Sequence, residues 1–297
     1  MLALALLHPV TELDWMSWSI HPSTVIGLAV LGAIYLWRAR QGNPRGIAGE
    51  QLAESAPGSD RESVSGIRKL SFFSALFIIF ASLNGPIHDL SDFYLFSAHM
   101  VQHLMLTLAM PPLLIWGVPG WMLRPLVQNR VTGAIARVVT RPVACFAIFN
   151  FVIVFWHLPL FYNAALADHN IHIIEHLMFM ASAVLMWWPL LSQLPELPRL
   201  AYPGQMLYCF LMSVAMSITA VYITMAEQIL YPAYSTAPRL WGLSPMDDQL
   251  LGGLIMWVPG GLIFVGIMSV VFFRWAGSGE DGEAGAQVGW KAGVGTA

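Results

Sequence analysis

Seven stretches of this sequence are long and apolar enough to cross a lipid bilayer as helices, and this feature constrains the fold most strongly. A membrane-spanning helix needs about 20 mostly apolar residues, because the hydrocarbon core is about 30 Å thick and each residue adds about 1.5 Å. Only 10% of the residues are charged, whereas a soluble domain carries about 25%. The predicted spans lie near residues 21–38, 70–87, 93–116, 142–159, 170–191, 204–227 and 248–273. We therefore predict an all-α membrane protein with a seven-helix transmembrane bundle.

Helix-breaking residues interrupt two of these spans, which implies that the helices pack closely. Pro111 and Pro112 lie inside the third span, and Pro259 lies inside the seventh. In lipid, neighbouring helices must satisfy the backbone groups that a proline frees. Paired glycines at 252–253 and 260–261 would let the seventh helix approach a neighbour closely.

Basic residues are distributed unequally between the two sets of loops. Thirteen of the fourteen Lys and Arg residues fall in the loops after the first, third and fifth spans and in the C-terminal tail, and only Arg239 falls in the opposite set. Because basic loops stay in the cytoplasm, the N-terminus is predicted to be outside and the C-terminus cytoplasmic. The domains expected are an outer segment (1–20), the transmembrane domain (21–275, with a cytoplasmic loop at about 39–69) and a flexible cytoplasmic tail (276–297).

All nine histidines fall in the half of this predicted bundle that faces away from the cytoplasm. His99 and His103 are four residues apart, as are His172 and His176, so each pair shares one helix face. His103 and His176 are expected at similar depths, about 16 Å and 12 Å below the start of their spans. Ionisable residues inside a span are costly and mostly line functional cavities. We therefore predict that these four imidazoles form a metal site.

The residues around the two pairs refine this prediction. Imidazole ligands suit copper, zinc, iron and nickel, and the thioethers of Met100 and Met180 favour reduced copper. Glu175 and Asp248 are expected to accept hydrogen bonds from the second ring nitrogens, although Asp248 also suits the positive end of the helix that it opens. His157 is a further candidate ligand, whereas loop or interface positions are predicted for His8, His21 and His169.

Other chemistries find little support in the sequence. It has no GxSxG, P-loop, GxGxxG or HExxH motif, and Glu175-His176 lacks the spacing of a zinc protease, so we do not expect an enzyme. No basic block is interleaved with aromatic residues, which argues against binding to nucleic acid. The two cysteines, Cys145 and Cys209, are too few for a disulfide framework and lie in apolar runs.

Four motifs, in this order, resemble the CtaG family, the multi-span assembly factors of caa-type cytochrome c oxidase. They are AHMVQHLMLTLAMPPLLIWGVP (98–119), FWHLPLFYNAAL (155–166), HIIEHLMFMASAVLMWWPLL (172–191) and DQLLGGLIMWVPGG (248–261). The resemblance runs from about 70 to 273. It implies a seven-helix protein of the bacterial inner membrane that is needed for active oxidase and acts in copper insertion into the catalytic subunit.

The resemblance also extends to individual residues. The paired histidines of the family match His99, His103, His172 and His176, and its Trp-His pair matches Trp156-His157. An unrelated single-span copper chaperone shares the family name but uses paired cysteines. This chain has no such pair, so the mechanism of that chaperone does not apply to it.

The sequence therefore predicts an assembly factor that holds copper at an outer-leaflet histidine cluster and passes it to subunits of cytochrome c oxidase. The other partners expected are the lipid bilayer and a periplasmic copper donor. Haem b, with one histidine from each of two helices, is an alternative cofactor. A copper transporter would need ligands in the cytoplasmic half, where only Cys145, Cys209 and scattered methionines occur. A purely structural scaffold for the oxidase is the remaining alternative.

Overall fold

The computed structural model describes residues 18–42 and 63–292, with side chains up to residue 278, and every regular element in these ranges is helical. The predicted all-α fold is therefore confirmed. In chain order the elements are α1 (Pro22–Gln41), α2 (Gly66–Leu83), α3 (Gly85–Phe93), α4 (Phe96–Leu104), the π-helical turn η1 (Met105–Ala109), α5 (Met110–Gly117), α6 (Gly120–Gln128), α7 (Arg130–Val139), α8 (Pro142–His157), α9 (Pro159–Ala167), α10 (His169–Leu191), α11 (Tyr202–Thr224), α12 (Pro232–Thr236) and α13 (Pro245–Ala292).

Six helical runs in the described part of the chain are long and apolar enough to cross a membrane. They are α1, α2, the run from α4 through η1 to α5, α10, α11, and α13 as far as Ser278. The pair α7 and α8 is a seventh candidate, bent by 76° between its two helices. These candidates match the seven predicted spans, with α8 at the place of the fourth. The orientation of the bundle in the membrane stays a prediction.

Two regions differ in detail from the sequence prediction. The loop between the third and fourth predicted spans contains two helices, α6 and α7. The Asn129 side chain caps α7 by accepting a hydrogen bond from the Val131 N–H at 3.0 Å. Helix α13 continues to Ala292, past the start of the predicted tail. Most of the predicted segment 1–20 and of the loop 39–69 lies outside the described residues, and the domain boundaries stay predictions.

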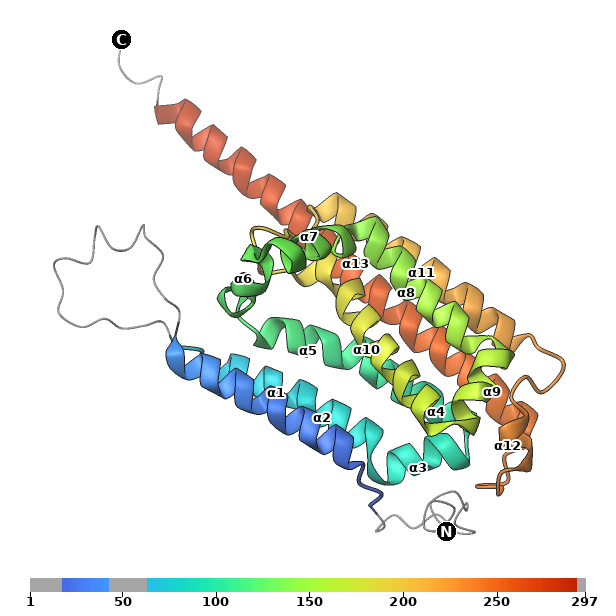
Figure 1. Ribbon diagram of the computed structural model, residues 1–297. Coiled ribbons are helices and arrows are strands. Elements are labelled where there is room, and N and C mark those ends of the chain that lie inside the picture. The colour runs from blue at the N-terminus through green and yellow to red at the C-terminus, as the bar shows by residue number, and fades with distance from the viewer. Residues whose placement is uncertain (1–17, 43–62, 293–297) are drawn as a thin grey trace.

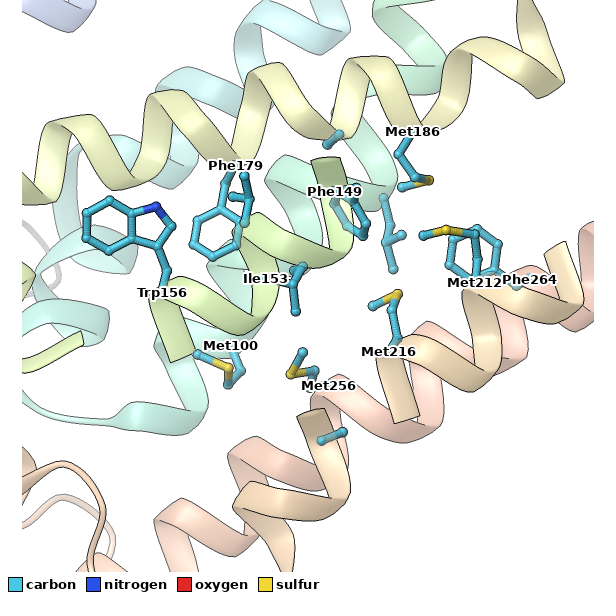
Figure 2. Close-up of a cluster of buried hydrophobic side chains, with 14 of the residues drawn as sticks. Met100, Phe149, Ile153, Trp156, Phe179, Met186, Met212, Met216, Met256 and Phe264 are labelled. Atoms are coloured by element: carbon cyan, nitrogen blue, oxygen red, sulfur yellow. The ribbon is translucent and has the colours of Figure 1, made fainter. Parts of the chain in front are cut away.

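The long helices pack into one bundle. Helices α4, α8, α10, α11 and α13 surround the main apolar core, while α1 and α2 pack on the side formed by η1 and α5 (Figure 1). The core is rich in methionine, and Figure 2 shows these thioether side chains gathered between the helices. An unbranched, flexible thioether fills irregular gaps between helices, which suits this position. The buried methionines of this main core are Met100, Met186, Met212, Met216 and Met256.

Small residues bring α13 close to two neighbours, as the sequence predicts. A Cβ atom at Gly252 would lie 2.4 Å from the Phe96 ring of α4. A Cβ atom at Gly253 would lie 2.3 Å from the Thr224 hydroxyl oxygen of α11. Both distances are too short for a side chain, so α13 can lie against α4 and α11 only because these positions are glycine.

The proline break in the third span is repaired by a tryptophan from α10. The Thr107 carbonyl would normally accept a hydrogen bond from the N–H four or five residues later, but Pro111 and Pro112 occupy those positions and have no N–H. The indole Nε1–H of Trp187 donates to this carbonyl at 2.9 Å. A neighbouring helix thus satisfies the freed group, and this bond connects the two helical runs that carry the paired histidines.

The histidines in the described residues gather at one end of the bundle, which we call the histidine end. It is the end at which α1 begins and at which α3, α9 and α12 lie, whereas α6 and α7 lie at the opposite end (Figure 1). This distribution agrees with the prediction that the histidines share one half of the bundle. His8 lies outside the described residues.

Replacing Trp187 by Phe should destabilise the bundle, because the buried Thr107 carbonyl would lose its donor. The expected loss is about 1–3 kcal/mol, measured as a lower midpoint of thermal unfolding in detergent. Trp37→Phe is the matched control, because Trp37 is 59% exposed on α1. Equal midpoints for the two variants would show that the Trp187 hydrogen bond does not hold the broken span.

Candidate metal centre

The two histidine pairs converge, as their spacing predicts. His99 and His103 project from α4, and His172 and His176 project from α10. The ring centroids of His103 and His176 are 5.6 Å apart, and that of His99 is 5.7 Å from His172 and 5.9 Å from His176. All four side chains are buried. The rings are therefore close enough to share one ion.

Two overlapping sets of donor atoms have the spacing of a metal site. The first set is His99, His172 and His176, and the second is His99, His103 and Glu175. Within each set the donor atoms lie within 4.8 Å of one another. The Nε2 atoms of His99 and His103 are 2.8 Å apart and share a hydrogen bond, so one of them would lose its proton when both bind a metal. With metal–nitrogen bonds of about 2.0 Å, this distance corresponds to neighbouring ligands at an angle of about 90°.

Oxygen acceptors hold the Nδ1 side of two of the rings. The Nδ1 atom of His172 lies 3.3 Å from Oδ2 of Asp92, a carboxylate of α3. In α8, the Nδ1–H of His157 donates to the Ile153 carbonyl at 2.8 Å. A neutral imidazole that donates from Nδ1 presents a lone pair at Nε2. Metal-binding histidines are oriented in this way by their outer partners.

A tyrosine network orients His99 in the same sense. The Tyr234 hydroxyl of α12 donates to the Ser91 carbonyl at 2.8 Å and also lies 3.2 Å from His99 Nδ1. Its single hydrogen is used by Ser91, so the Nδ1–H of His99 donates to the hydroxyl oxygen. The Tyr162 hydroxyl reaches the same oxygen at 2.9 Å. His99 therefore also presents Nε2 to the centre, where it meets His103.

Several buried polar atoms at the centre have no hydrogen-bond partner among the residues that the structure describes. A buried polar atom without a partner costs about 1–3 kcal/mol, so such a group of atoms calls for an explanation. A cation bound beside the Nε2 atoms and the Glu175 oxygen would use their lone pairs, whereas His103 Nδ1 lies on the other side of a ring whose Nε2 meets His99. The atoms are His103 Nδ1, His157 Nε2, His172 Nε2, His176 Nε2 and Glu175 Oε1.

Negative charge lies next to the imidazoles. Burial would raise the pKa of the Asp92 carboxyl, but the adjacent His88 and His172 rings act in the opposite direction, and the net pKa lies below the ordinary value. The Asp92 carboxyl group contacts both rings, with Oδ2 3.4 Å from His88 Nε2 and 3.3 Å from His172 Nδ1. Glu175 adds a second carboxyl group, which is only 1% exposed. The centre thus combines neutral nitrogen donors with carboxylate oxygens.

Asp248, predicted to support the histidine rings, instead holds the start of α4. Its carboxylate accepts the backbone N–H groups of Phe96 at 2.7 Å and Ser97 at 3.0 Å, and the Ser97 hydroxyl at 2.5 Å. The carboxylate caps α4 from a different helix, α13, and suits the positive end of α4. Because His99 follows three residues after Phe96, Asp248 positions the centre without touching it.

The two predicted thioethers lie in different surroundings. Met100 is 1% exposed and belongs to the apolar core, where Figure 2 shows it beside Met256. Met180 lies one helical turn after His176 and lines a cavity that also contacts His172 and His176. The ring centroid of His157 lies 5.8 Å from that of His103, so this further candidate is next to the centre.

Sequence reasoning missed Asp92 and Tyr234 as partners of the centre. Asp92 follows His88 by four residues, which would place both on one helix face, but this segment lies between two predicted spans and was not expected to be helical. Tyr234 has no comparable signal. It lies 135 residues from His99 in the chain, on a short helix after α11.

A comparison with protein families gives a match that covers most of the chain. The family model described as cytochrome c oxidase caa3 assembly factor matches residues 33–278. No curated protein and no solved structure matches the chain.

Replacing Asp248 by Ala should loosen the start of α4, because two buried backbone N–H groups would lose their acceptor. We expect a loss of stability of about 1–3 kcal/mol, read from thermal unfolding in detergent. The control is Asp247→Ala, because the Asp247 carboxylate accepts the Ser244 hydroxyl at 2.6 Å on the exposed surface. An equal effect of the two substitutions would contradict a positioning role for Asp248.

Proposed function

The chain belongs to the family of cytochrome c oxidase caa3 assembly factors, and from this premise we propose that it binds copper at the buried histidine centre and supplies it to the oxidase. Family membership makes the protein an oxidase assembly factor, and its apolar helices make it a multi-pass membrane protein. The bacterial inner membrane is consistent with this family. Copper binding and its transfer to the oxidase are the proposed part of this function.

One observation carries the proposal: donor atoms of buried imidazoles from two separate helices, α4 and α10, lie within 4.8 Å of one another. His99 comes from α4, His157 from α8 and His172 from α10, and each has an oxygen atom next to Nδ1. A hydrogen-bonded structural histidine would normally use both ring nitrogens. Here His157 and His172 have an Nε2 atom without a partner among the described residues. Such an arrangement supports metal binding.

The choice of copper rests on the oxidase rather than on the donor set alone. Nitrogen and carboxylate donors accept several transition metals, and copper binds such sites more tightly than zinc. The resemblance to the CtaG family implies a role in copper insertion into the catalytic subunit. Because Met100 packs in the apolar core, Met180 is the predicted thioether that lies near the imidazoles, in the cavity lined by His172 and His176. A copper ion is thus cargo for this protein, held until it is transferred.

The geometry supports a single ion better than a haem. Two axial haem ligands lie on opposite sides of the iron, so their nitrogens are about 4 Å apart. Bis-histidine ligation would use one ring from α4 and one from α10, and the His103 and His176 rings are packed together, with their centroids 5.6 Å apart. The ring of Phe179 also packs at 4.4 Å from that of His103, between centroids. A macrocycle would have to separate these groups.

A transport function has a weaker basis. Ligands for a path across the membrane would have to continue to the opposite end of the bundle. Buried methionines do extend along the core, as Figure 2 shows. Within the described residues, however, both sets of His and carboxylate donors with metal-site spacing lie at the histidine end. The methionines also fit a role in packing.

Copper titration of the purified protein tests the proposal directly. We expect about one tightly bound copper ion per chain, because the donor atoms surround a single volume. The double variant His103→Ala plus His176→Ala removes donors from both sets and should lose this ion. His169→Ala is the control, since it removes an exposed histidine outside the centre and should keep it.

The outcomes of the titration separate the alternatives. Unchanged stoichiometry in the double variant, or none in the wild-type protein, would refute the copper centre. A Soret band in the absorption spectrum of the purified protein would favour haem instead. Thermal unfolding of each variant in detergent shows whether lost binding reflects lost folding.

Oxidase assembly in cells gives a second test. In a strain that depends on this protein, the double variant should reach the membrane in normal amount but yield oxidase with less copper and lower activity. Copper analysis of the purified oxidase measures this effect. If the variant supports oxidase with full copper content, the protein acts as a structural scaffold and the copper proposal is wrong.

A further inference from the structure

A second group of histidines lies beside the buried centre and lines a cavity at the histidine end. The cavity has a volume of about 290 Å³ and lies between α1, α2, α3 and α10. His21, His88 and His169 line it together with His172 and His176 of the centre. The same cavity therefore contacts both histidine groups.

The rings of the two groups form an unbroken series. The centroid of His169 lies 5.3 Å from that of His21, and His21 lies 4.8 Å from His88. His88 lies 6.1 Å from His172, which lies 4.4 Å from His176. Each step is about the distance over which two imidazoles can share one ion. At each step, an ion could therefore bind the next imidazole before it dissociates from the previous one.

Exposure falls along this series. His169 is exposed and His21 is half-buried, whereas His88, His172 and His176 are only 5–7% exposed. His21 Nε2 is itself shielded from solvent and has no hydrogen-bond partner among the described residues. The series thus leads from the surface to the centre, and His21 stands near its outer end with an unsatisfied nitrogen.

The outer group is held in place by the fold. The backbone N–H of His21 donates to the Asn84 side chain at 2.8 Å, and the Gly85 N–H donates to the Ser19 carbonyl at 3.0 Å. The Asp92 carboxylate contacts both His88 and His172, so it joins the outer group to the centre. These contacts fix the start of α1 against α3 with the histidine rings facing one another.

We propose that His21, His88 and His169 form a first binding station, through which a copper ion reaches the buried centre along the imidazoles of this cavity. The inference rests on the proposed function, because it assigns the route to that copper centre. Ligand exchange moves the ion, with each new nitrogen bound before the previous one is released. The Asp92 carboxyl group contacts His88 and His172 on this route, and the Met180 thioether lines the cavity together with His176.

The rate of copper loading tests the route separately from the centre. Copper(I) is added to the purified full-length protein in lipid nanodiscs, and bound metal is measured over time. The variant His21→Ala plus His169→Ala should load about tenfold more slowly or worse, which corresponds to a barrier raised by about 1.4 kcal/mol. Its final stoichiometry should equal that of the wild-type protein, because the donors of the centre remain.

A second variant narrows the cavity without removing any histidine. Gly27 lines the cavity on α1, and a Cβ atom there would meet nothing within 4 Å. Gly27→Phe should therefore place a ring in the cavity and slow loading as well. Gly266→Phe is the matched control, because Gly266 also has open space around its Cβ direction but lies on α13, away from this cavity.

The outcomes distinguish the route from the centre. Wild-type loading rates in both the histidine variant and Gly27→Phe would overturn the route while leaving the copper centre in place. Loss of stoichiometry in the histidine variant would also overturn it, because these residues would then belong to the centre. If the wild-type protein takes up no copper, the proposed function itself fails. Bound lipid displaced by Gly27→Phe, with loading unchanged, would identify the cavity as a lipid site.

Discussion

The geometry of the centre depends on which nitrogen of each histidine ring carries the proton. An imidazole becomes a ligand only when one nitrogen is free of its proton, and the partner of the other nitrogen decides which one that is. Tyr234, Ile153 and Asp92 place oxygen atoms beside Nδ1 of His99, His157 and His172. These oxygens come from α12, α8 and α3, so the lone pairs converge only when the whole histidine end has folded. His103 differs, because its Nδ1 has no partner among the described residues and its ring is placed by packing on Phe179.

The bilayer imposes a second requirement, which serves the same centre. Every backbone group freed in lipid must find a partner within the protein, and the double proline after His103 frees the Thr107 carbonyl. The Trp187 indole that satisfies it lies eleven residues after His176 on the same helix, so the repair fixes the α4–η1–α5 run against α10. At the start of α4, the Asp248 carboxylate accepts hydrogen bonds from the backbone N–H groups of Phe96 and Ser97. The α4–η1–α5 run, which carries His99 and His103, is therefore held by Asp248 of α13 at its start and by Trp187 of α10 at Thr107.

The periodic features of the sequence predicted much of this arrangement, and the non-periodic ones did not. Apolar length located the spans, and four-residue spacing placed His99 with His103 and His172 with His176, because both follow directly from helix geometry. The glycines of α13 also acted as expected, since close approach is a steric property. Tyr234 and Asp92 could not be foreseen, because their contacts depend on how short helices between the spans fold back. Asp248 and Met100 show a related limit, because residue type alone suggested that both contact the imidazoles. Their positions around their helices instead place the Asp248 carboxylate at the start of α4 and the Met100 side chain in the apolar core.

A cation inside a membrane protein requires compensation that nitrogen donors alone do not give. Neutral imidazoles replace the water ligands of the ion, but they leave its charge in a medium of low dielectric constant, where isolated charges are very costly. Asp92 lies against His172, and Glu175 belongs to one of the donor sets, so carboxyl oxygens are available within the same volume. A buried carboxylate is itself costly without a positive partner. In the proposed centre, an ion and a carboxylate would therefore stabilise each other. A series of imidazoles that leads outward from such a centre lets an ion exchange ligands gradually, without one step in which it is stripped of every donor.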